Sequence, residues 1–112
     1  MHLTPDILEA TYDWLRALPP FRQWRLPPGD EVVFRVLGTK KLSAQHYFDG
    51  ERHTIDMSAA KVAHTTSIVV LMAHEMCHVR ANVLGERAEH GPVFESAARQ
   101  VCRHHGFDPK EF

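Results

Sequence analysis

The amino-acid sequence predicts an α+β fold in which three helices pack against one small antiparallel sheet. Three segments have apolar residues at helical spacing, and β-branched and aromatic residues gather between the first two of them. The 112 residues, of which 44% are hydrophobic and 24% charged, match the size and composition of one globular domain. We therefore expect a single domain over residues 1–112, with a core of modest size.

The first helix is expected near the N-terminus. Thr4 can cap it, Pro5 suits the first helical position, and Pro19 and Pro20 stop it. Apolar residues recur at helical spacing between these signals and predict an amphipathic helix: Ile7, Leu8, Tyr12, Leu15 and Leu18.

Three strands are expected next. Residues 31–37 (EVVFRVL) have the β-branched and aromatic side chains of a strand. Asp49-Gly50 is a dipeptide typical of hairpin turns, and it lies between two more strand-like segments, residues 43–48 and 52–57. This pattern predicts an antiparallel sheet of about three strands with one hairpin.

Two more helices complete the pattern. One is expected over residues 66–84, because apolar residues recur at helical intervals and Gly85 follows as a C-terminal stop. The other begins at Pro92, directly after a glycine, and ends at Gly106. The first of these two helices contains the residues that point to chemistry.

Residues 74–78 (HEMCH) place two histidines and a glutamate on that helix. Because an α-helix repeats every 3.6 residues, His74 and His78 lie one turn apart on one face, close enough to hold a single ion. Glu75 is rotated by about 100° from His74, which suits a base acting on water beside the ion. The surrounding sequence is hydrophobic nearly all round, so burial of these groups costs free energy unless a partner such as a metal compensates.

A catalytic zinc usually takes three protein ligands and leaves one position open. His90 is the leading candidate for the third ligand. The helix rises about 9 Å beyond His78 before it ends, whereas the five-residue loop that follows can span about 17 Å and bring His90 back. Glu95 and Glu89 are alternatives, because carboxylates also bind zinc.

Peptide hydrolysis also needs a hydrogen-bond donor for the oxyanion of the tetrahedral intermediate. The candidates in this sequence are His46, Tyr47, His53 and Arg80. Their spacing does not connect any of them to the metal ligands, so the choice stays open.

The sequence carries no signal for export or for a membrane. Its first twenty residues lack a basic segment followed by a continuous apolar run, and no apolar run approaches membrane-spanning length. Cys77 and Cys102 lie in predicted helices, which suits two small buried side chains better than a disulfide. We therefore expect a cytoplasmic protein without a membrane partner.

Most of the chain resembles the SprT-like zinc metallopeptidase domain, the group that includes the eukaryotic Spartan proteases. The matching pieces are His74-Glu75-x-x-His78, His90-Gly91-Pro92-x-Phe94, the final helix that ends near a glycine, and a hairpin within residues 43–62. Together they cover about residues 32–107 of a minimal zincin-like domain. The resemblance implies that His74, His78 and His90 bind Zn²⁺, that Glu75 is the general acid/base, and that the activity is proteolysis.

The resemblance says less about the substrate. Spartan-like proteins cleave proteins that are crosslinked or bound to DNA, with the help of additional zinc-ribbon and DNA-binding segments. The two cysteines here provide no zinc ribbon, and a formal charge of −1 shows no bulk signature of nucleic-acid binding. We expect a protein or peptide substrate; a nucleic-acid partner is allowed by the resemblance but not supported by charge.

The expected function is therefore a zinc-dependent metallopeptidase that hydrolyses peptide bonds with zinc-activated water and Glu75 as general base. An alternative keeps the metal without catalysis: a zinc-stabilised binding or regulatory module, suggested by the short chain without a visible substrate-recruiting segment. A third reading, a peptidase of cell-wall peptides, would need export or a lysis partner, and the N-terminus carries no export signal.

Overall fold

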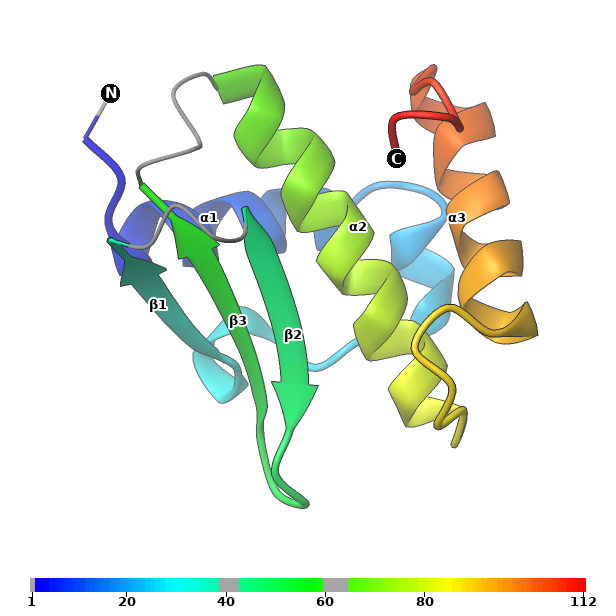
Figure 1. Ribbon diagram of the computed structural model, residues 1–112, viewed down its shortest axis with the longest axis horizontal. Helices are drawn as coiled ribbons and strands as arrows, with labels where there is room; N and C mark the ends of the chain where they lie inside the picture. The colour runs from blue at the N-terminus through cyan, green and yellow to red at the C-terminus, as the bar shows by residue number, and fades with distance from the viewer. Residues whose placement is uncertain (1, 39–42, 60–64) are drawn as a thin grey trace.

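The computed structural model describes residues 2–38, 43–59 and 65–112, which form three α-helices and a three-stranded sheet (Figure 1). The predicted α+β class is confirmed. In chain order the elements are α1 (Pro5–Arg16), the 3₁₀ turns η1 (Phe21–Trp24) and η2 (Gly29–Glu31), β1 (Val33–Leu37), β2 (Ala44–Phe48), β3 (His53–Ser58), α2 (Thr65–Val83) and α3 (Pro92–His105). None of the helices in these residues has the length and apolarity to cross a membrane.

The sheet is mixed, with strand order β1-β3-β2. The predicted hairpin is confirmed: β2 and β3 pair antiparallel, and the Asp49 carboxylate accepts the backbone N–H groups of Glu51 and Arg52, each at 2.8 Å. The expectation of an antiparallel sheet throughout was wrong for β1, which pairs parallel to β3. All residues of β3 are buried, and β3 lies between β1 and β2. Strand β1 therefore pairs with β3, the second strand of the hairpin, and not with β2, which follows β1 in the sequence.

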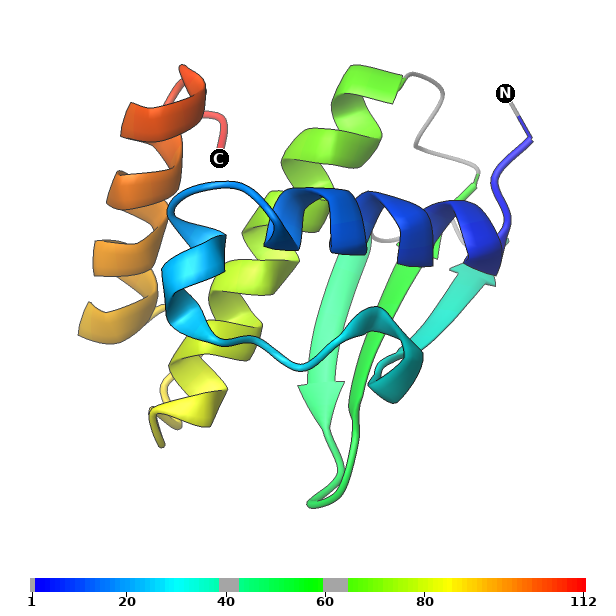
Figure 2. The ribbon, with the colours of Figure 1, turned by 180° about the vertical axis from the view of Figure 1, so that it is seen from behind.

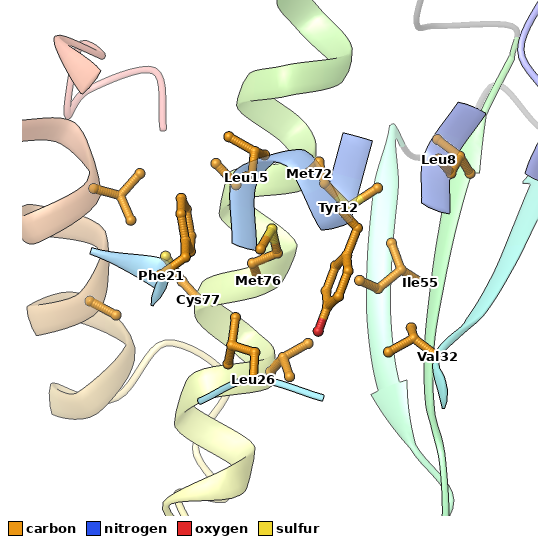
Figure 3. Packing of buried hydrophobic residues seen from close by; sticks show 14 of the residues in the cluster. Leu8, Tyr12, Leu15, Phe21, Leu26, Val32, Ile55, Met72, Met76 and Cys77 are labelled. Carbon is orange, nitrogen blue, oxygen red and sulfur yellow. The ribbon is translucent and has the colours of Figure 1, made fainter. Parts of the chain in front are cut away.

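The core lies on one face of the sheet, beneath α1 and α2. Helix α1 crosses the back of the sheet (Figure 2), capped by Thr4 as the sequence predicts, with its hydroxyl 3.2 Å from the N–H of Ile7. Tyr12 lies between α2 and the sheet (Figure 3), packs edge-on to Phe34 at 5.4 Å and donates its hydroxyl to the carbonyl of Pro27 at 2.6 Å. From α2, fully buried side chains join this cluster, each worth about 1.5–3 kcal/mol on burial: Met72, Met76 and Val79.

A polar clamp ties all three strands together on the opposite face. Asp56 of β3 is fully buried, and its carboxylate accepts Nε and Nη2 of Arg35 from β1, at 2.7 and 2.8 Å, and Nε2 of Gln45 from β2, at 2.8 Å. Burial raises the pKa of Asp56, but the hydrogen bonds from Arg35 and Gln45 and the charge of Arg35 outweigh it and lower the pKa below its ordinary value. The clamp therefore stabilises the sheet with Asp56 ionised.

Replacing Asp56 by Asn should lower the free energy of unfolding by about 1.5–3 kcal/mol at neutral pH, because hydrogen bonds to a charged group are lost. Since the folded-state pKa of Asp56 is lowered, its contribution is present above the unfolded pKa of about 3.9 and is lost as the pH falls through the folded pKa. Urea denaturation at several pH values should show the difference from wild type shrinking below about pH 4. The same change at exposed Asp30 should cost less than about 0.5 kcal/mol, and equal losses at both positions would contradict the clamp.

Candidate metal centre

Helix α2 presents two histidines from one face. The side of the helix that packs on the core is fully buried, so the backbone of α2 is held firmly in place. His74 and His78 lie one turn apart and stay half-buried, and their ring centroids are 5.1 Å apart. Both rings also contact Phe94 of α3, with centroids 5.1 and 4.3 Å from its ring.

His90 reaches the same place from the loop between α2 and α3. Gly85, with a φ of 85°, turns the chain just after α2 ends. The ring centroid of His90 lies 4.9 Å from that of His78 and 5.7 Å from that of His74. One ring nitrogen from each histidine lies within 4.8 Å of the others, so the three could hold a metal ion.

The alternative third ligands are not part of this group. Across residues 2–38, 43–59 and 65–112, the three histidines are the one set of three potential ligands close enough to hold an ion. Glu89 acts on the site through its charge, which raises the pKa of Glu75 and of His74. Glu95, on α3, shares a cavity of about 270 Å³ with His90 and Phe112 on the side of the site away from the sheet.

The loop that carries His90 is fixed by the carboxylate of Glu86. Its two oxygens accept the backbone N–H groups of Val93 and Phe94, at 2.8 and 2.9 Å, and so cap the N-terminus of α3. A Cβ at Gly91 would lie 2.6 Å from this carboxylate, so a side chain there would push the carboxylate away from the N-terminus of α3. Glu86 and Gly91 together set where the chain places His90.

The C-terminal segment returns from the end of α3 toward α2 (Figure 1) and contacts His74. The backbone carbonyl of Phe112 lies 2.7 Å from Nδ1 of His74. A carbonyl can only accept, so Nδ1 carries the proton and Nε2 keeps a free lone pair for a metal. The Phe112 ring, 5.3 Å from that of His74, covers the same side.

Burial favours the neutral form of the two imidazoles on α2. It lowers the pKa of His78 to about 4, and the neighbouring His74 and His90 add to the shift. Burial likewise lowers the pKa of His74, assisted by His90 and partly opposed by the Phe112 carbonyl and Glu89. Neutral imidazole is the form that binds a metal ion.

Glu75 follows His74 on α2 and has only 4% of its surface exposed. Burial raises the pKa of its carboxyl to about 8, and the charge of Glu89 adds to the shift. It has no hydrogen-bond partner in the described part of the chain, and no buried side-chain oxygen there lacks one, so its carboxyl oxygens still meet solvent. The group is therefore available to exchange a proton with water.

Of the four candidate oxyanion donors, His46 and Tyr47 line a cleft together with His78, whereas His53 contacts His46. Arg80 extends over the Trp24 ring and donates to the Trp24 carbonyl, at 3.4 Å. Tyr47 accepts a hydrogen bond from Arg35 on the far face of the sheet. His46 stacks parallel to His78, with centroids 6.1 Å apart, and hydrogen-bonds to His53.

Sequence reasoning missed Glu86, Phe94 and Phe112 as parts of the site. An acidic residue shortly before a helix that begins with Pro is a signal for an N-terminal cap, and it could have indicated Glu86. The contact of Phe112 with His74 spans 38 residues, and no local pattern announces it.

Comparison with known proteins gives one family match. A model described as SprT-like family matches residues 21–111, that is 91 of the 112 residues. The matched span begins at η1 and includes the whole sheet, α2, α3 and the three histidines. No curated protein matches the chain.

Replacing Glu86 by Ala should free the loop that carries His90 and weaken metal binding by about 10- to 100-fold, the range typical of residues that support a ligand. Competition for Zn²⁺ with a chromogenic chelator measures the affinity. Arg87→Ala, an exposed change in the same loop, serves as the control and should leave the affinity unchanged. If the two variants bind Zn²⁺ equally well, Glu86 does not position His90.

Proposed function

The chain belongs to the SprT-like family, and from this premise we propose that it is a zinc metallopeptidase in which His74, His78 and His90 bind Zn²⁺ and Glu75 is the general base. The observation that carries the proposal is the convergence of three imidazole nitrogens within 4.8 Å of one another, two of them from the helix that also carries the almost buried carboxyl of Glu75. The residues fit the ion: small side-chain rotations bring such nitrogens to the separation of about 3.4 Å expected between ligands of a tetrahedral zinc.

Zinc at this site would polarise the carbonyl of the scissile bond and lower the pKa of water toward about 7. Glu75 accepts a proton from the attacking water and passes it to the nitrogen of the leaving amine. The Phe112 carbonyl keeps the His74 ring in the orientation that leaves Nε2 free, and Glu86 holds the loop of His90. Each residue thus has a defined task around one scissile bond.

The edge of β2 that faces away from β3 pairs with no other strand of the described residues, and this edge supports a protein or peptide as the substrate. The backbone N–H of Asp49 donates to the carbonyl of Arg52, and that of Ser58 donates to the carbonyl of Ser43. In an antiparallel ladder hydrogen-bonded pairs alternate with pairs that are not hydrogen-bonded, so the backbone N–H and C=O of His46 point away from β3. Strand β2 lies at the edge of the sheet next to α2 (Figure 1). An extended peptide can add a strand there, beside the histidines.

One observation favours the alternative of a zinc-stabilised module without catalysis. His90 and His78 both pack on the Phe94 ring, with centroids 4.7 and 4.3 Å away, so a bound ion would also join α2 to α3. In that case the ion stabilises the fold, and no turnover accompanies it. Glu75 separates the two functions, because a purely structural site has no use for a buried general base.

Replacing Glu75 by Gln should lower the cleavage of fluorescein-labelled casein by about 10²- to 10⁴-fold, because the general base is lost, while Zn²⁺ stays bound. Cleavage and zinc content are measured on the same metal-loaded protein. Glu95→Gln, at an exposed carboxylate outside the histidine group, should retain both. Undiminished cleavage by purified Glu75→Gln protein would refute the proposed mechanism.

Replacing His90 by Ala should weaken Zn²⁺ binding by more than about 100-fold, because removal of a direct ligand lowers the affinity more than removal of a residue that supports a ligand. Isothermal titration with ZnCl₂ measures affinity and stoichiometry. His104→Ala, at an exposed histidine on the last turn of α3, is the matched control. Unchanged affinity in His90→Ala would move the third ligand to another residue.

A further inference from the structure

His46 and His53 form a hydrogen-bonded pair across the β2–β3 hairpin. Nε2 of His46 lies 2.9 Å from Nδ1 of His53, and the two ring planes differ by 24° with centroids 5.1 Å apart. His53 is 8% exposed, on the central strand, and packs under the Phe48 ring at 4.6 Å. The pair therefore fixes the orientation of the His46 ring from a rigid part of the sheet.

The fixed ring of His46 stands directly beside the candidate metal centre. It is parallel to the His78 ring within 8°, with centroids 6.1 Å apart. Both histidines line a cleft of about 240 Å³ between the second half of β2, the C-terminal half of α2 and the loop of residues 86–89. A peptide added to the free edge of β2 would pass His46 as it approaches His78.

One ring nitrogen of His46 remains unused. The bond to His53 occupies Nε2, and Nδ1 has no hydrogen-bond partner among residues 2–38, 43–59 and 65–112. In the part of the chain that the structure describes, every buried side-chain nitrogen or oxygen has a partner, so Nδ1 is open to solvent. When Nδ1–H of His53 donates the hydrogen bond, Nε2 of His46 is the acceptor. The neutral His46 ring then carries its proton on Nδ1, which is a hydrogen-bond donor.

We propose that Nδ1–H of His46 stabilises the oxyanion of the tetrahedral intermediate, with His53 as the positioning residue; this inference rests on the proposed peptidase function. As the oxygen of water bonds to the carbonyl carbon, the C=O π electron pair moves onto the carbonyl oxygen, while Glu75 holds the proton. The C–N bond then breaks, the C=O bond re-forms, and Glu75 gives its proton to the departing nitrogen. His46 transfers no proton; its hydrogen bond is strongest while the oxygen carries negative charge.

Amide substitutions can separate the two nitrogens of His46. The side-chain NH₂ of Asn reaches about as far as Nδ1, whereas the side-chain oxygen of Gln reaches about as far as Nε2 and can accept the N–H of His53. His46→Asn therefore keeps the donor toward the substrate, His46→Gln keeps only the link to His53, and His46→Leu keeps neither. His53→Asn preserves a donor toward Nε2, and His53→Leu removes it.

The test compares the affinity of zinc-loaded variants for two inhibitors of the same peptide sequence. A phosphinic alanine peptide presents a tetrahedral anion, and a thiol peptide reaches the metal through sulfur without an oxyanion. His46→Gln and His46→Leu should bind the phosphinic peptide about 10²-fold more weakly than wild type, the scale of a lost oxyanion donor. His46→Asn and His53→Asn should stay within about tenfold of wild type, with thiol-peptide affinity and zinc content unchanged in all variants.

Casein cleavage by the same proteins distinguishes this inference from the proposed function. A fall in kcat at similar KM for His46→Gln, with recovery in His46→Asn, would support both. If wild type cleaves casein and all His46 variants bind the phosphinic peptide equally well, the role of His46 is refuted and the peptidase stands. If the expected affinity pattern holds but wild type cleaves nothing, the hydrogen bond is real and the peptidase function fails. Equal losses of affinity for both inhibitors would show that His46 only maintains the structure, and would refute its role as an oxyanion donor.

Discussion

Desolvation of the ionisable side chains on α2 is the constraint to which the rest of the structure responds. The helix must bury its apolar side to complete the core, yet the same helix carries His74, Glu75 and His78. Burial disfavours the charged form of each group, so it keeps the imidazoles neutral and raises the pKa of the carboxyl. A divalent cation at the histidines would relieve this cost, because it would neutralise an ionised Glu75 and use the free imidazole lone pairs.

The elements around α2 supply what a metal site needs beyond two histidines. The loop after α2 brings in His90, and the hydrogen bonds of Glu86 to the N-terminus of α3 determine where that loop ends. The C-terminal segment adds the Phe112 carbonyl behind His74. The geometry of the centre thus depends on contacts between α2, α3 and the C-terminal segment. The contacts of Glu86 and Phe112 orient the rings of His90 and His74 and add no ligand themselves.

Sequence patterns predicted the elements better than their arrangement. Pro5, Pro92 and the glycines after α2 and α3 mark helix ends accurately, because their backbone preferences are local. The pairing of β1 with β3 was missed, because strand order depends on which strand buries the most surface, and hydrophobic patterns within one strand do not encode its neighbours. The same limit applied to His46: its residue type suggested a donor, but only the hairpin register places it beside His78.

By itself, the sequence determined the α+β class, the helix that carries HEMCH and the three histidines as potential ligands, since the spacing of two of them on a helix and the reach of a short loop are matters of local geometry. The tertiary structure decided the rest: Glu89 and Glu95 lie outside the histidine group, Arg80 donates to the Trp24 carbonyl, the Tyr47 hydroxyl is bonded to Arg35, and Glu86 and Phe112 orient the site. These outcomes required the packed structure, because each depends on a contact between segments whose relative position is set by the burial of the core and not by any nearby residue.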